Sequence, residues 1–100
     1  MDITTEQIEA WKEKYGDIFS ITPIDGIRII YKPLDRGGYM NIMSQQMEGI
    51  IGDPELETVK LCVLNELPSD IFATRGGLAT VIYEEIMKTS GFTVVESVQL

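Results

Sequence analysis

Any chemistry in this chain must come from a small set of side chains, because its 100 residues contain no histidine. Histidine is the usual general base and the commonest metal ligand. Cys62 would need a neighbouring positive field to act as a thiolate, and its setting, VKLCVL, is typical of a buried small hydrophobe. Glu84 and Glu85 would point about 100° apart on a helix, so they cannot face each other. We predict no catalytic residue, no metal ligand, no cofactor and no enzymatic activity.

One glycine-containing segment could bind an anion. Arg75-Gly76-Gly77 opens a predicted helix, and free backbone N–H groups at a helix start can hold a negative group. The motif is short and lacks the lysine and the spacing of a phosphate loop. This composition favours a flexible start to the helix over an anion site.

A row of flexible apolar side chains is the best candidate for a binding site. Steps of three, four and three residues separate Met40, Met43, Met47 and Ile50, which we call the methionine face. This spacing aligns the four residues on one side of a helix. Methionine adapts its shape at low cost and is common where a surface accepts varied apolar partners. A stripe at this spacing is more often core than groove, so both interpretations stay open.

The charge balance argues against two classes of partner. Sixteen acidic residues against eight basic ones give a net charge of −8. Sequence-independent nucleic-acid binding needs a basic patch that displaces counterions, and anionic membrane surfaces also attract basic segments. No segment has the roughly 18 consecutive apolar residues of a membrane span, and MDITTEQ lacks the features of a signal peptide. We predict no nucleic-acid partner and no membrane partner.

The N-terminal third predicts a helix followed by a β-hairpin. Residues 4–16 carry a capping box and end at a glycine. Residues 17–32 are β-favouring, and Asp25-Gly26 supplies a two-residue hairpin loop. Because Pro23 cannot donate a ladder hydrogen bond, the first strand should be an edge strand. The loop predicts two cross-strand pairs, Ile24 with Ile27 and Ile21 with Ile30.

Three further helices are predicted over residues 39–51, 53–67 and 74–92. The second begins at a capping aspartate followed by proline. Its apolar face should comprise Leu56, Val59, Leu61, Val63, Leu64 and Leu67. The third should present Leu78, Val81, Ile82 and Ile86 to the core and end in a Schellman-type cap at Gly91-Phe92.

These elements predict a single small α+β domain over residues 1–100, in the order α-β-β-α-α-α. One β-hairpin packs on a helical bundle, and the helix of residues 74–92 lies between the helix of residues 53–67 and the N-terminal helix. Residues 1–3 and 93–100 are predicted to be loose, although the tail TVVESVQL also favours a terminal strand.

Motifs along residues 8–92 resemble those of small tail assembly chaperones and related tail proteins of long-tailed bacteriophages. The closing motif is the most specific of the four. In chain order they are I-x-x-W-K-x-K-Y-G at 8–16, the aromatic-x-Pro segment at 31–33, K-x-C-V-L at 60–64 and G-L-x-x-x-I-x-E-x-I-x-K-x-S-G-F at 77–92.

The resemblance implies a non-enzymatic chaperone that works in the host cytoplasm and binds apolar helical segments of the phage tape measure protein. We expect the methionine face to make this contact. The tail tube protein is a further implied partner. The chain ends soon after Gly91-Phe92, without the extension that many such chaperones use for the tube contact, so this contact stays open, as does homo-oligomerisation. The alternatives are a structural virion or tail-connector component and a small phage inhibitor of a host protein.

Overall fold

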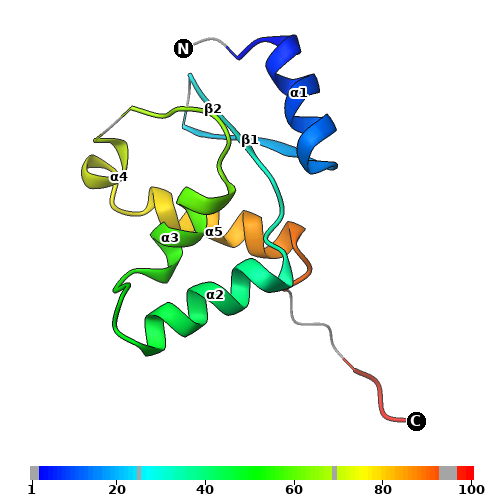
Figure 1. Ribbon diagram of the computed structural model, residues 1–100, viewed down its shortest axis with the longest axis vertical. Helices are drawn as coiled ribbons and strands as arrows, with labels where there is room; N and C mark the ends of the chain where they lie inside the picture. The colour runs from blue at the N-terminus through cyan, green and yellow to red at the C-terminus, as the bar shows by residue number, and fades with distance from the viewer. Residues whose placement is uncertain (1–2, 25, 69, 93–96) are drawn as a thin grey trace.

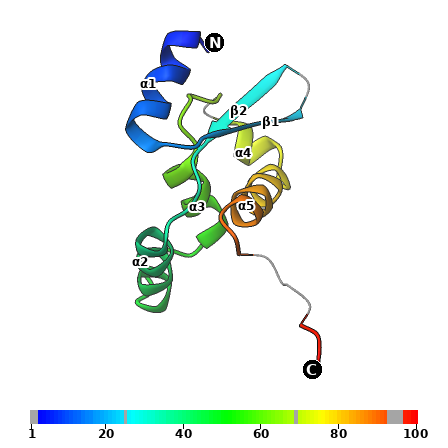
Figure 2. The ribbon, with the colours of Figure 1, turned by 90° about the vertical axis from the view of Figure 1, so that its right-hand side faces the viewer.

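A two-stranded hairpin separates one N-terminal helix from a group of helices (Figures 1 and 2). The computed structural model describes residues 3–24, 26–68, 70–92 and 97–100. The predicted α+β class and element order are confirmed, except that a short additional helix, α4, precedes the last predicted helix. The elements are α1 (Thr5–Tyr15), β1 (Phe19–Ile24), β2 (Ile27–Tyr31), α2 (Arg36–Met47), α3 (Pro54–Cys62), α4 (Ile71–Thr74) and α5 (Leu78–Thr89).

The capping signals of α1 are confirmed. The Thr4 hydroxyl accepts a hydrogen bond from the Gln7 amide at 3.1 Å, and the Gln7 side chain accepts one from the Thr4 amide at 3.0 Å. Gly16 ends the helix with a φ of +80°. None of the α1 residues is buried, and the Tyr15 ring lies 4.8 Å from the Lys32 ammonium at the end of the hairpin. Helix α1 therefore rests on the hairpin rather than in the core.

The hairpin register differs from the prediction by one residue along most of its length. Ile24 pairs with Ile27 as predicted. Ile21 pairs with Ile29, so the predicted pairing with Ile30 is wrong. Between these two pairs, two residues of β1 lie opposite one residue of β2, which is the pattern of a β-bulge.

The bulge contains Pro23, whose missing N–H weakens a regular ladder at this position. Residue 25 of the predicted hairpin loop lies outside the described residues, and Gly26 has a φ of +80°. One edge of the sheet is formed by β1, as predicted from Pro23, and the other edge of β2 is covered by residues that follow α3.

Helix α3 ends at Cys62, so its predicted extension to Leu67 is wrong. Val63 leaves the helix and forms an isolated antiparallel bridge with Tyr31 of β2. The Lys32 amide also donates to the Cys62 carbonyl at 3.0 Å. Pairing with β2 satisfies backbone groups that a longer helix would have satisfied internally, so tertiary contact overrides the apolar helical pattern.

Asn65 continues this edge with its side chain. Its amide oxygen accepts from the Ile30 amide at 2.8 Å, and its amide nitrogen donates to the Arg28 carbonyl at 2.9 Å. Leu64 adds a backbone bond, because its amide donates to the Ile30 carbonyl at 2.8 Å. The segment after α3 therefore acts as a partial third strand.

The predicted continuous helix over residues 74–92 is wrong at its start. Thr74 ends the short helix α4, and α5 begins at Leu78. Two consecutive glycines separate the helices, and glycine has the highest entropic cost of helix formation after proline. The predicted C-terminal cap is confirmed, because Gly91 has a φ of +87° and the Phe92 amide donates to the Met87 carbonyl at 2.8 Å.

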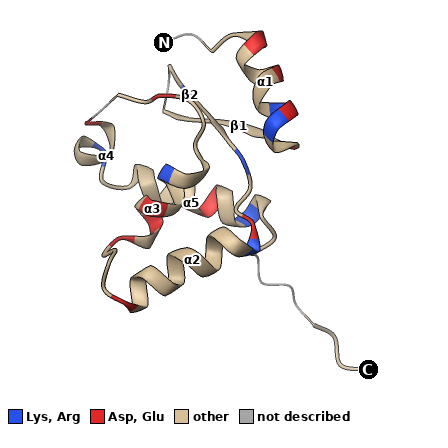
Figure 3. Cartoon of the chain, viewed as in Figure 1, with Lys and Arg blue, Asp and Glu red and all other residues tan. Residues whose placement is uncertain are grey.

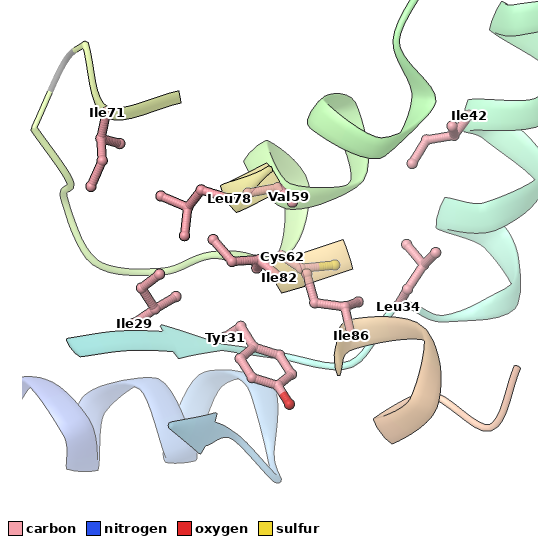
Figure 4. Packing of buried hydrophobic residues seen from close by; sticks show 10 residues of the cluster. All are labelled: Ile29, Tyr31, Leu34, Ile42, Val59, Cys62, Ile71, Leu78, Ile82 and Ile86. Atoms are coloured by element: carbon pink, nitrogen blue, oxygen red, sulfur yellow. The ribbon is translucent and has the colours of Figure 1, made fainter. Parts of the chain in front are cut away.

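Helix α5 packs mainly on α3, α4 and β1. The hairpin lies between α5 and α1 (Figure 2), so the prediction that α5 packs between α3 and the N-terminal helix is wrong for the second partner. Figure 4 shows the core between these elements, formed by Ile29, Tyr31, Leu34, Ile42, Val59, Cys62, Ile71, Leu78, Ile82 and Ile86.

Two side-chain hydrogen bonds fix the C-terminal end of α5 to the rest of the fold. The Tyr31 hydroxyl lies 2.8 Å from the Thr89 hydroxyl, and the Leu34 amide donates to the Ser90 hydroxyl at 2.7 Å. The predicted terminal strand falls partly on residues 93–96, outside the described residues, and residues 97–100 are exposed and form no regular element.

Candidate partner-binding surface

Helix α2 carries the methionine face and has well-defined ends. Its N-cap is Asp35, whose carboxylate accepts from the Gly38 amide at 2.7 Å, so the helix begins three residues before the predicted start. It ends at Met47 rather than at residue 51. Gly49 then takes a φ of +75°, and the Ile50 amide donates to the Gln45 carbonyl at 2.9 Å. This Schellman arrangement holds Ile50 against the end of the helix.

The methionine face points away from the core. Met40 is 50% exposed, Met47 86% and Ile50 66%, while Met43 is half-buried. The buried residue of α2 is Ile42, which lies about 140–160° around the helix from Met40 and Met47. Interpretation of the stripe as core is therefore wrong for its three exposed members.

Close contacts on the opposite side of α2 set this orientation. A Cβ atom at Gly38 would lie 3.0 Å from the Leu34 Cδ1 atom and 3.3 Å from the Leu61 Cδ2 atom. The rings of Tyr39 and Phe92 pack with centroids 4.7 Å apart. Gly38, Ile42 and Tyr39 thus face the rest of the fold, and Figure 4 shows Ile42 projecting from α2 toward α3.

Two other residues predicted for the core are exposed. Leu61 is 44% exposed and Val81 is 47% exposed. The buried residues of α3 are Val59 and Cys62, as predicted, together with the polar residue Thr58, which was not predicted. The Thr58 hydroxyl donates to the Pro54 carbonyl at 2.7 Å, which explains how its polar atom is tolerated there. The spacing of apolar residues along α3 does not indicate that Thr58 is buried, because threonine is polar.

The sites that could carry chemistry are not assembled into a reactive centre in the described residues. Cys62 is fully buried, and burial raises the pKa of its thiol to about 11. Glu84 is exposed and Glu85 half-buried, on different sides of α5. The Arg75–Gly77 segment is an exposed connection between α4 and α5. Among the described residues, no three Cys, Asp or Glu side chains are grouped to hold a metal ion.

Acidic residues concentrate beyond the C-terminal end of the methionine face. Glu48 is the C-cap of α2, and Asp53 caps α3. Glu55 and Glu57 follow in the first turn of α3. Figure 3 shows these acids along the α2–α3 connection, whereas the blue residues near the start of α2 lie at its opposite end.

Comparisons with known proteins give no relative from which a role could be transferred. No protein-family model, curated protein or solved structure matches the chain. Within the described part of the chain, no helix has both the length and the apolar character needed to cross a membrane. Function is therefore inferred from the surface itself and from the sequence motifs.

Proposed function

We propose that this protein is a tail assembly chaperone of a long-tailed bacteriophage, acting without catalysis in the host cytoplasm. Its methionine face would bind apolar helical segments of the tape measure protein. The observation that carries this proposal is the outward exposure of Met40, Met47 and Ile50 on a well-capped helix. The order of the four motifs along residues 8–92 supports the choice of family.

The chemistry of the face suits a partner whose apolar side chains vary along its length. Methionine is unbranched and polarizable, so it fits differently shaped neighbours at low cost. The backbone beneath it is fixed by the Asp35 cap and by the bond from the Ile50 amide to the Gln45 carbonyl. Flexible side chains on a fixed helix can accept successive stretches of a long helical protein, as in other helix-binding grooves.

Co-expression with the tape measure protein of the same phage tests the proposal. The wild-type chain should keep the tape measure protein soluble and co-purify with it. Met47→Asp removes a contact worth about 1.5–3 kcal/mol when fully buried, so it should weaken binding about tenfold or more. Met43→Asp should act in the same direction, with circular dichroism used to confirm folding because Met43 is half-buried.

A matched control uses the same helix and the same added charge. Asn41 is exposed and lies about 100° around α2 from Met40, so Asn41→Asp should leave co-purification unchanged. Absence of a complex at micromolar concentrations of both wild-type proteins would refute the proposed function. Equal losses in Asn41→Asp and Met47→Asp would refute the assignment of the contact to the methionine face.

A further inference from the structure

Acidic side chains gather at the C-terminal end of the methionine face. Residues 37–59 contain four acidic residues and neither lysine nor arginine. These acids are Glu48, Asp53, Glu55 and Glu57. The single basic residue of α2, Arg36, lies at the N-terminal end, one turn before Met40 on the same side of the helix. Its guanidinium lies 5.3 Å from the centre of the Tyr39 ring. The exposed apolar face therefore ends in an acidic region.

The acids are close enough to act on a segment bound to the face. Glu48 directly follows Met47, and the three peptide units between Ile50 and Asp53 limit their Cα separation to about 11 Å. The Debye length at about 0.1 M salt is roughly 10 Å, so these carboxylates are only partly screened from such a segment. The Glu57 carboxylate forms an ion pair with Lys60, whose ammonium lies 3.9 Å away.

We propose that the segment bound by the methionine face is an amphipathic helix of the partner whose apolar stripe is flanked by lysine or arginine. This inference rests on the proposed function for the existence of a bound helix, and it adds the charge of that helix. Basic side chains beside the stripe would lie near Glu48 and Asp53, where opposite charge favours docking and fixes its direction. A second copy packed in parallel would instead place two acidic ends together, and each copy has a net charge of −8.

Three fluorescein-labelled peptides of about 18 residues, or five helical turns, test the inference. All carry one leucine stripe, and their flanking positions are lysine in the first peptide, glutamine in the second and glutamate in the third. Fluorescence anisotropy measures their binding to the full chain. We expect the lysine peptide to bind at least tenfold more tightly than the glutamate peptide. Its affinity should fall steeply between about 0.1 and 1 M NaCl, as the Debye length shortens from roughly 10 to 3 Å.

Two pairs of variants separate local recognition from general attraction to an acidic protein. Glu48→Gln should weaken lysine-peptide binding about two- to fivefold, as expected for one exposed ion pair. Glu13→Gln makes the same charge change on an exposed residue of α1, at the other end of the molecule, and should have no effect (Figure 1). Met47→Asp should weaken binding although it adds negative charge, whereas attraction by net charge alone would strengthen it.

Three results would overturn the inference. Equal affinity for the lysine and glutamate peptides, with both lost in Met47→Asp, would reject the charge preference while leaving helix binding in place. Self-association of the chain through the methionine face, with no peptide binding, would assign the face to a second copy. Failure of all three peptides to bind would also reject it, whereas the proposed function fails only if the tape measure protein does not co-purify.

Discussion

Alanine substitutions at two adjacent glycines of α2 should differ in stability. A Cβ atom at Gly38 would lie 3.0 Å from the Leu34 Cδ1 atom, 3.3 Å from the Leu61 Cδ2 atom and 3.2 Å from the capping Asp35 carboxylate. At Gly37 its nearest neighbour would be the same carboxylate at 3.7 Å, which is ordinary van der Waals contact. Only at Gly38 would an added Cβ atom be in tight contact with neighbouring side chains.

The two effects of each substitution can be separated. Alanine in place of glycine within a helix contributes about 0.5–1 kcal/mol of stability at either position. Overpacking at Gly38 costs about 1–3 kcal/mol, because Leu34 and Leu61 must move or α2 must shift. The free energy of unfolding of Gly37→Ala should therefore exceed that of the wild type by about 0.5–1 kcal/mol. That of Gly38→Ala should be lower than that of Gly37→Ala by about 1–3 kcal/mol.

Urea unfolding followed by circular dichroism measures this difference directly. In thermal unfolding, each kcal/mol corresponds to about 4–8 °C in Tm for a domain of this size. Because a shift of α2 would also reorient the methionine face, Gly38→Ala should reduce partner binding more than Gly37→Ala. Equal unfolding midpoints for Gly37→Ala and Gly38→Ala would show that α2 does not pack closely on Leu34 and Leu61.

Two further predictions concern buried groups. Asn65→Ala should lower the free energy of unfolding by about 2–3 kcal/mol, because it leaves the Ile30 amide without its partner; urea unfolding checks this against Glu66→Ala, an exposed neighbour. Cys62 should destabilise the fold at alkaline pH, because its thiol pKa rises from 9.0 to about 11 on folding. This thiol should leave the free energy of unfolding unchanged below pH 9 and lower it by about 1.4 kcal/mol per pH unit between pH 9 and about 11. Urea unfolding of Cys62→Ala over the same pH range should lack this decrease.

Local signals in the sequence located most of the elements. Three local caps satisfy backbone groups within a few residues, so their effects can be read without knowledge of the fold. They are Thr4 with Gln7, Asp53 with the Leu56 amide, and Gly91 with Phe92. The Ile24–Ile27 pair is equally local, because the hairpin loop fixes it.

The errors occur where distant segments decide the structure. Val63 leaves its helix because Tyr31, 32 positions earlier, offers a strand edge. The orientation of α2 depends on Gly38, whose lack of a side chain allows close approach to Leu61. The spacing of the methionines predicted one face correctly, but spacing alone cannot say which side of a helix meets the core. Ile42 and Gly38, four residues apart, mark that side.

The energetics of the methionine face favour a partner with repeated sites. The exposed fractions of Met40, Met47 and Ile50 amount to about two whole side chains, whose burial would contribute roughly 3–6 kcal/mol. Association itself costs an estimated 4–15 kcal/mol, so one copy on one site would bind weakly even with favourable charge pairs. Several copies on a long helix would gain from high effective concentration only if they also contact one another. Such binding would be strong for the assembled row and weak for each member, which would suit the proposed chaperone.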